Sequence, residues 1–356
     1  MKKLISIILI VSILFAQMLV FTACEPKPKL NKFNEYYFDY FDTATTIIGY
    51  EESQEDFDVV CAEIENLLKE YHQLFTIYNR YEGINNITTI NDLTDGKHNV
   101  VTVDQRIIDM LTFSKEMYNK TNGNVNIAMG SVLKIWHIYR NQGLSDPVNA
   151  QLPPMEKLRE AAEHTDINNL IIDDENNTVY LADPQMSLDV GAIAKGYAAE
   201  KIAQHLEEMG VTGYLLNLGG NVRTIGMAND NKWNVGIENP DTENEEVPFI
   251  EYLRASGESI VTSGSYQRFY VVNGEPYHHI IDPITLMPGT KYRSVSVITD
   301  DSGLGDAMST ALFLMDYEEG KKLVDSVDNV EVMWVMNDGE QRYSDGFKAY
   351  TYIPEE

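Results

Sequence analysis

The sequence is poor in cysteine and in positive charge. Its 356 residues include two cysteines, and 27 Lys and Arg stand against 55 Asp and Glu, which gives a formal net charge of -28. Because Cys24 and Cys61 cannot build a disulfide framework, the fold must be stabilised by burial, for which a hydrophobic fraction of 44% is ample. A surface this acidic repels phosphate backbones and no basic patch interrupts it, so nucleic-acid binding is not expected. No fixed repeat period is present, which excludes a solenoid.

One long apolar run is present, at the N-terminus. Two lysines precede the uncharged stretch Leu4–Ala23, which is followed directly by Cys24. About 20 apolar residues could cross a bilayer as a single helix. Small residues immediately before a cysteine are instead typical of a lipoprotein signal. We therefore expect a signal peptide over residues 1–23, lipidation of Cys24 on the outer face of the cell membrane, a polar linker over 24–35 and one domain over 36–356.

The spacing of apolar residues predicts the order of helices and strands. Apolar positions recur at steps of three and four from Glu55 to Tyr78, as in an amphipathic helix. Similar patterns predict helices over 104–118, 152–164, 192–209 and 306–315, a hairpin over 169–181, strands over 186–190, 214–218, 233–237, 259–262, 269–272 and 294–298, and a β-rich tail. Strands in runs with a few helices between them favour an α+β fold.

The segment SLDVGAIAKG, residues 187–196, combines a strand, a glycine turn and the start of a helix. The turn at Gly191 lets a ligand approach the backbone. The N-terminus of a helix attracts phosphate or pyrophosphate, and Lys195 adds a full positive charge. The spacing is not that of the nucleotide-triphosphate P-loop, because Lys195 precedes Gly196. The alternative is a plain strand-turn-helix junction in which Asp189 caps the helix and Lys195 is solvated.

Two further segments carry glycine and polar side chains. Residues 217–221 (NLGGN) follow an apolar strand, where paired glycines allow a tight turn or the close passage of a ligand. Residues 262–268 (TSGSYQR) and 277–283 (YHHIIDP) could form a hairpin that brings hydroxyls, an arginine and two histidines together. Histidine is the usual proton acceptor near neutral pH, so His279 or His278 is a candidate general base. A zinc site is less favoured, because adjacent residues of a strand face opposite sides.

The segment GDAMSTA, residues 305–311, is a candidate cation site. Asp306 and Thr310 are four residues apart, so on a helix both oxygens project from one face. Carboxylate, hydroxyl and carbonyl oxygens suit magnesium, which keeps positions open for substrate phosphates. The alternative is an aspartate cap on a helix packed by its apolar residues.

Taken in order, DVGAIAKGYAAE, NLGGN, TSGSYQR, HHIIDP and GDAMSTA resemble the ApbE family, the FAD:protein FMN transferases, many of which are lipoproteins. The resemblance implies an ApbE-type fold with mixed or antiparallel sheets flanked by helices. It also implies an activity: magnesium-bound FAD is split at its pyrophosphate, FMN is attached to a Thr or Ser hydroxyl of a partner protein, and AMP leaves. Some relatives hydrolyse FAD to FMN and AMP instead.

We propose His279 as the base because of its place in the HHIIDP segment, and Lys195 as a positive charge in addition to magnesium. The resemblance itself implies roles for further residues. The implied magnesium ligands are the Ala192 carbonyl, Asp306 and Thr310, with Ser309 adjacent. The implied contacts with flavin or adenine are Phe41, Tyr78, Ala128, Met129, Gly130, Asp189, Lys195 and Ile280.

The chain departs from the family pattern at three places. The family's DPxTGxP segment has Leu286 in place of its glycine, Met-Gly-Thr is replaced by Phe41-Asp42-Thr43, and Asp-x-Thr by Asn126-Ile127-Ala128. Three functions stay open: transfer of FMN to an extracytoplasmic acceptor protein, FAD pyrophosphatase activity, and non-catalytic flavin binding. The chain contains no Asp-Gly-x-Ser/Thr-Gly-Ala-Thr acceptor motif, so it is not expected to flavinylate itself.

Overall fold

A computed structural model describes residues 29–244 and 246–354 of the chain. The predicted signal peptide and Cys24 lie outside these residues. None of the helices within the two ranges is long and apolar enough to cross a bilayer. The predicted linker over 24–35 overlaps the first strand, because residues from Asn31 onward pair with the next strand of the sheet.

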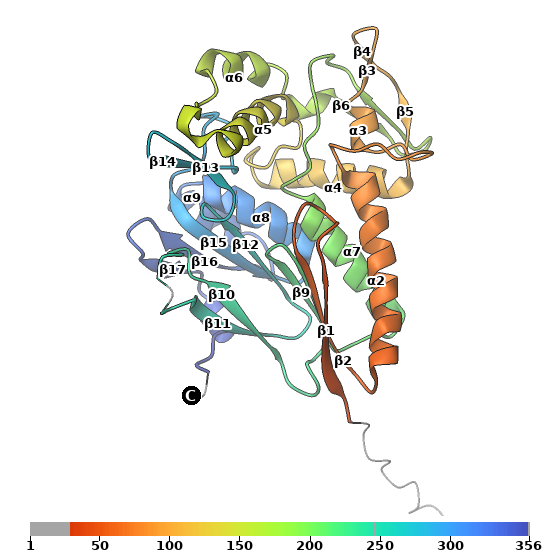
Figure 1. Ribbon diagram of the computed structural model, residues 1–356, viewed down its shortest axis with the longest axis vertical. Helices are drawn as coiled ribbons and strands as arrows, with labels where there is room; N and C mark the ends of the chain where they lie inside the picture. Colours follow the sequence, from red (N-terminus) through yellow and green to blue (C-terminus); the bar gives the residue numbers. More distant parts are fainter. Residues whose placement is uncertain (1–28, 245, 355–356) are drawn as a thin grey trace, which may run out of the picture.

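An eight-stranded sheet forms the centre of the molecule (Figure 1). Every neighbouring pair in it is antiparallel. In order across the sheet, the strands are β1 (Asn31–Tyr37), β2 (Thr45–Glu51), β8 (Tyr214–Leu218), β9 (Asn221–Ile225), β12 (Ser259–Gly264), β15 (Tyr292–Thr299), β16 (Glu331–Met336) and β17 (Gln341–Tyr343).

Four small antiparallel sheets surround the central one. They pair β10 (Trp233–Glu238) with β11 (Phe249–Ala255), β13 (Phe269–Val272) with β14 (Glu275–His278), β3 (Leu93–Thr94) with β4 (Lys97–His98), and β7 (Thr178–Leu181) with both β5 (Val101–Thr102) and β6 (Leu170–Asp173). The helices are α2 (Gln54–Phe75), α3 (Ile87–Ile90), α4 (Gln105–Lys120), α5 (Gly130–Ser145), α6 (Met155–Ala162), α7 (Ala194–Glu208), α8 (Ser302–Leu314) and α9 (Tyr317–Asp325), with short 3-10 turns at Pro147–Asn149, Ile167–Asn169 and Phe347–Ala349.

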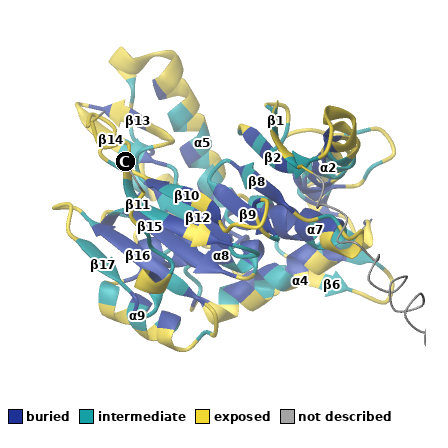
Figure 2. Ribbon diagram, turned by 90° about the horizontal axis from the view of Figure 1, so that it is seen from below, coloured by how far each residue is buried: buried dark blue, intermediate teal, exposed yellow. Residues whose placement is uncertain are grey.

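The two faces of the central sheet are buried against different partners. Alternate residues of a strand point to opposite faces, and here Leu216 and Trp334 belong to the core shared with α2, α7 and α8. Their neighbours Leu215 and Val335 belong to a second core beneath the β10–β11 hairpin. Figure 2 shows the dark blue strands between α8 and this hairpin. A third apolar cluster joins α5 and α6 to the β13–β14 hairpin at the upper end of Figure 1.

A buried ion pair ties two helices to the sheet. The guanidinium of Arg223 on β9 lies 2.9 Å from the carboxylate of Glu200 on α7, and the two side chains are 5% and 7% exposed. Glu200 also accepts a hydrogen bond of 2.9 Å from the backbone N–H of Ser302, the first residue of α8. Because a buried charge is costly unless paired and hydrogen-bonded, these contacts fix the register of α7 against α8.

The α+β architecture is confirmed, and four details of the predicted elements are corrected. Residues 186–190 do not form a strand: Ser187 makes an isolated bridge to Met129, so the segment pairs with a loop and not with the sheet. The helix expected at 192 begins at Ala194. The helix expected at 306 begins at Ser302, because Asp301 caps it by accepting from the N–H of Leu304. The tail predicted as β-rich includes α9.

Candidate functional site

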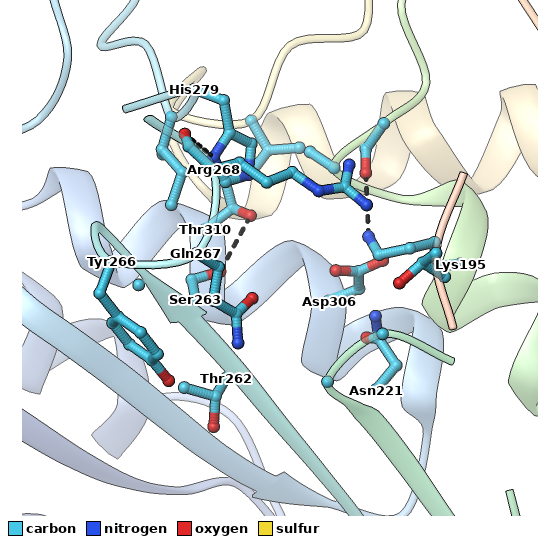
Figure 3. Close-up of a pocket in the computed structure, with 18 of the residues that line it drawn as sticks. Lys195, Asn221, Thr262, Ser263, Tyr266, Gln267, Arg268, His279, Asp306 and Thr310 are labelled. Atoms are coloured by element: carbon cyan, nitrogen blue, oxygen red, sulfur yellow. Dashed lines mark hydrogen bonds and ion pairs between the residues drawn. The ribbon is translucent and has the colours of Figure 1, made fainter. Parts of the chain in front are cut away.

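A cavity of about 550 Å³ lies where the central sheet, the segment at 124–129 and the two segments that flank the β13–β14 hairpin, 266–268 and 279–281, meet. Lys195, Asp306 and Asn221 lie on one side of it and Tyr266 on the other, while Arg268 extends between them (Figure 3). The residues that line it include Thr43, Tyr78, Met129, His137, Arg140, Asp189, Ala192, Lys195, Asn221, Glu238, Tyr266, Arg268, His279, Ile280, Asp306 and Thr310.

The contact between α7 and α8 determines where Asp306 lies. The N–H of Gly196 donates to Asp306 Oδ2 at 2.9 Å, and Lys195 Nζ lies 3.4 Å from the same oxygen. A Cβ on Gly196 would lie 2.2 Å from the Ser302 carbonyl oxygen and 2.5 Å from Asp306 Cβ. Glycine is therefore required here for the helices to approach closely.

The same hydrogen bond changes the backbone at the start of α7. In a regular helical turn an N–H bonds to the carbonyl four residues earlier, which for Gly196 is that of Ala192. Gly196 donates to Asp306 instead, so the Ala192 carbonyl, at the cavity wall, lacks that partner. The N-cap of α7 is Ile193, with no side-chain cap.

Asp306 is a buried residue, 4% exposed, whose carboxylate faces the cavity. Burial raises the pKa of Asp306, and the opposing positive charge of Lys195 only partly offsets this effect. Asn221 lies beside Asp306 in Figure 3. Its side-chain oxygen Oδ1 is a second buried oxygen and has no hydrogen-bond partner. An added cation would stabilise the charged form of the carboxylate.

The oxygens around Asp306 fit a magnesium ion. Asp306, Thr310 and Ala192 all line the cavity, and together they offer a carboxylate, a hydroxyl and a free carbonyl, which are hard oxygen ligands. No group of three His, Cys, Asp or Glu that could hold a metal lies within the described ranges. A site here would therefore use one carboxylate with neutral oxygens, and leave positions for phosphate oxygens.

The hydroxyls of Ser309, Ser263 and Thr310 form a continuous series of hydrogen bonds. Ser309 is fully buried and does not line the cavity. Its hydroxyl donates to the carbonyl of Asp306 at 3.1 Å and lies 2.9 Å from Ser263 Oγ, which in turn is 3.4 Å from Thr310 Oγ1. Ser309 therefore holds the backbone of Asp306 directly and Thr310 through Ser263, from a position outside the cavity.

The contacts of Asp189 and Lys195 differ from those expected if Asp189 capped the helix and Lys195 were solvated. Asp189 Oδ1 accepts from the N–H of Gly191 at 3.0 Å, which caps the turn before α7 and not the helix itself. Its other oxygen is 3.8 Å from His137 Nε2. Lys195 is 20% exposed and bridges the Gly191 carbonyl and Asp306, so its ammonium group is directed at the cavity wall and not at bulk solvent.

The two adjacent histidines point in different directions, as strand alternation predicts. His278 is buried, with Nε2 2.6 Å from the Gly289 carbonyl. His279 lines the cavity, and its Nδ1 lies 3.3 Å from the Arg268 carbonyl. Because a carbonyl only accepts, Nδ1 carries the proton and Nε2 is left to accept one. Burial, with Arg268 second, lowers the pKa of His279 to about 3.

The remaining residues implied by the resemblance divide into two groups. Tyr78, Met129 and Ile280 line the cavity. Phe41, Ala128 and Gly130 do not. Gly130 packs against Ser187, where an added Cβ would lie 2.5 Å from the carbonyl oxygen, Ala128 is fully buried, and the Phe41 ring packs edge-on against His72.

Several cavity residues were not predicted from the sequence. His137 and Arg140 lie one turn apart on α5, a spacing that could have indicated a shared face. Glu238 accepts a 3.4 Å hydrogen bond from Tyr266. It lies on a different sheet, and no local pattern pointed to it.

Two of the departures from the family pattern lie at unusual backbone positions. Asp42 and Leu286 stand where the family has glycine, and their φ angles are 50° and 62°. These are left-handed conformations that cost most side chains about 1–2 kcal/mol. Leu286 is held by packing and by its carbonyl, which accepts from Trp136 Nε1 at 3.0 Å. Both positions therefore adopt a left-handed backbone without a glycine.

The structure defines an α+β protein with a cavity of about 550 Å³ lined by Lys195, Arg140, Arg268 and the buried Asp306. Comparison with known proteins identifies its family. The model of the ApbE family matches residues 41–334. The FAD:protein FMN transferase of Klebsiella pneumoniae is 31% identical over 279 residues, 78% of this chain and 82% of that protein. That of Treponema pallidum is 33% identical over 261 residues, 69% and 70% of the two chains.

A solved structure gives the same result. The crystal structure of the ApbE protein of Thermotoga maritima superposes with a TM-score of 0.77 at 26% identity, covering 91% of this chain and 100% of that one. The chain belongs to the ApbE family, which confirms the resemblance seen in its five segments.

Substitution of Gly196 by alanine tests the α7–α8 contact. The added Cβ must push α7 away from α8, so we expect a loss of about 1–3 kcal/mol in the free energy of unfolding and a marked loss of FAD affinity. Denaturant titration and flavin fluorescence measure the two.

The matched control is Gly339→Ala. Gly339 has a φ of +89° and open space around its Cβ, so alanine there costs stability through backbone strain alone. FAD affinity should survive this control. Equal losses of affinity in the two variants would contradict the role of Gly196.

Proposed function

We propose that this chain transfers FMN from FAD to a Thr or Ser hydroxyl of a partner protein in a magnesium-dependent reaction that releases AMP. The observation that carries the proposal is the placement of Asp306 and Thr310 on one face of α8, open to a cavity that also contains Lys195 and His279. Membership of a family whose curated relatives are FAD:protein FMN transferases supports it.

The cavity suits an anionic dinucleotide. Its volume of about 550 Å³ lies within the usual range for small-molecule sites. Lys195, Arg140 and Arg268 line the cavity and balance the three carboxylates that also line it, those of Asp189, Glu238 and Asp306. In a protein with a net charge of -28, this balance reduces the local repulsion of a pyrophosphate. A bound magnesium ion would neutralise charge on the phosphoryl oxygens and hold them in line.

The protein's part in the reaction is positioning and proton transfer. The acceptor hydroxyl oxygen forms a bond to the phosphorus of the FMN half of FAD, the bond from that phosphorus to the bridging oxygen breaks, and AMP leaves with the electron pair. Lys195 stabilises negative charge on the phosphoryl oxygens, as phosphoryl transfer requires. His279 Nε2 takes the hydroxyl proton.

Nearby positive charge adds to the effect of burial in lowering the pKa of His279. Arg268 and Lys195 are among the positive groups that disfavour its protonated form. A pyrophosphate beside these groups offsets their charge and raises the pKa of His279 towards the range in which histidine is an effective base.

Variants of the cation site test the proposed reaction. The soluble domain is incubated with FAD and magnesium, with and without an acceptor protein that carries the family's motif. AMP and the mass of the acceptor are measured. We expect AMP release coupled to a gain of FMN mass. Asp306→Asn and Thr310→Val should each lower the rate roughly 10²-fold or more, because the cation contributes several kcal/mol of charge stabilisation.

Asp325→Asn is the control, since Asp325 forms only an exposed pair with Lys321. AMP release without a gain in acceptor mass would show FAD pyrophosphatase activity instead. FAD retained with no AMP at all would show a flavin carrier, and either result would contradict the proposal.

His279→Ala tests the proposed base. Loss of a general base typically costs 10²–10⁴-fold, so we expect acceptor flavinylation to fall by about that factor while FAD affinity, measured separately, changes little. His278→Ala would not test the base, because His278 does not line the cavity and bonds to the Gly289 carbonyl. Near-normal transfer by His279→Ala would remove His279 from this role.

We further propose that the protein is held on the outer face of the cell membrane by a lipid on Cys24. The apolar run Leu4–Ala23 directly before this cysteine supports the proposal. In cells expressing the full chain, the mature protein should begin at Cys24 and carry acyl chains there, which mass spectrometry of the N-terminal peptide measures. Cys24→Ser should lose this acylated peptide and keep residues 1–23, whereas Cys61→Ser, at a buried position, is the matched control and should change neither. A native chain that keeps residues 1–23 without an acyl group would indicate an uncleaved transmembrane helix.

A further inference from the structure

We propose that His72 on α2 is a positioning residue: as a neutral imidazole it holds the turn at 40–43, which fixes Arg268 across the cavity, and its protonation releases that turn. The link to catalysis rests on the proposed function, because Arg268 lines the cavity assigned to FAD. The mechanical part of the proposal does not.

The geometry requires a neutral ring. The N–H of Phe41 donates to His72 Nδ1 over 3.0 Å. A ring nitrogen that accepts a hydrogen bond carries no proton, so the proton of the neutral ring is on Nε2. The rings of Phe41, Tyr40 and Tyr81 meet the imidazole edge-on, with centroids at 5.8, 6.1 and 6.3 Å. His72 is thus confined by three aromatic side chains.

The turn that His72 holds is one the chain would not adopt unaided. Phe41 and Asp42 are both left-handed, with φ angles of 55° and 50°, and neither is glycine. Such backbone persists only where its surroundings enforce it. Three hydrogen bonds do so here: Phe41 N–H to His72, Thr43 N–H to the Tyr40 carbonyl at 3.3 Å, and Arg268 Nη2 to the Asp42 carbonyl at 2.9 Å. A proton on His72 removes the first of them.

The turn leads directly into the site. Thr43 lines the cavity and packs so closely on Gly219 that an added Cβ there would lie 2.1 Å from its hydroxyl. Arg268, held by the Asp42 carbonyl, contacts His279 Nδ1 through its own carbonyl at 3.3 Å. A contiguous series of contacts therefore runs from α2 through the turn to the proposed base.

The groups around His72 determine the direction of its pH response. Burial lowers the pKa of His72, and the carboxylate of Asp42 on the turn only partly opposes this. The other titratable groups that face it are the phenols of Tyr40 and Tyr81, and burial raises the pKa of Tyr40 to about 12. On α2 itself, Glu65 is engaged by the Tyr40 hydroxyl at 3.1 Å.

The sign follows from these directions. Above the ordinary histidine pKa of about 6.5, the ring is neutral whether the turn is closed or open, and closure carries no proton penalty. Below it, the open turn binds a proton that the closed turn excludes, so closure weakens as the pH falls towards the lowered pKa of the closed form.

Two variants and hydrogen exchange test the proposal. His72→Asn keeps an acceptor close to the Nδ1 position and does not titrate, whereas His72→Phe keeps a ring and loses the acceptor. Exchange is followed by mass spectrometry without ligand and expressed as protection factors for residues 38–44, with α4 as the internal reference. FAD affinity is measured in parallel from pH 5 to 8.

We expect His72→Phe to lose protection at 38–44 and to bind FAD roughly tenfold more weakly at every pH. The native chain should acquire both changes only below about pH 6.5. His72→Asn should stay close to the native chain at pH 8 and keep its protection below pH 6.5. The difference between the native and His72→Asn curves isolates His72 from the cavity histidines.

Native protection at 38–44 in His72→Phe, with α4 unchanged, would overturn the positioning role. Identical pH profiles for the native chain and His72→Asn would overturn the effect of the proton. If the native chain failed to bind FAD, the proposed function would fall, while the exchange data would still decide whether His72 holds the turn.

Discussion

The hydrogen bond from the N–H of Gly196 to the carboxylate of Asp306 is the contact on which the site depends. It requires two helices to approach so closely that no side chain fits between them. It directs a buried acid into the cavity and at the same time leaves the carbonyl of Ala192 without its helical partner. One backbone group thus determines the positions of two oxygens that we propose as cation ligands. The buried pair of Arg223 and Glu200, which also engages the first turn of α8, maintains the register that makes the contact possible.

The rest of the fold gives the cavity a charge balance that differs from that of the whole chain. The central antiparallel sheet is buried on both faces and provides a rigid support for α7 and α8. The chain is strongly acidic, yet in its cavity Lys195, Arg140 and Arg268 balance the carboxylates of Asp189, Glu238 and Asp306. Desolvation makes the buried carboxylate of Asp306 a costly charge. The proposed cation would lower this cost and supply the attraction that an anionic dinucleotide needs.

Local patterns in the sequence predicted much of this arrangement. The spacing of apolar residues along the sequence predicted α2 and the hairpin at 169–181. Strand alternation predicted that His278 and His279 point in opposite directions. Asp306 and Thr310 were identified because four residues make one helical turn. The errors arose where tertiary contacts decide. The helix predicted over 306–315 left out Gly303 and Gly305, which lie inside α8, where an added Cβ at Gly305 would press on Val261 at 2.8 Å. The role of Asn221 and the turn held by His72 depend on distant partners, which no local pattern contains.

We propose that the α7–α8 contact places Asp306, Thr310 and the Ala192 carbonyl so that they can bind a divalent cation. The most direct test is anomalous diffraction from crystals grown with FAD and Mn²⁺, which shares magnesium's preference for oxygen ligands. We expect a single strong peak within bonding distance of these three groups and of phosphate oxygens of FAD. A peak elsewhere, or FAD bound in the cavity with Asp306 contacting only Gly196 and Lys195, would contradict it.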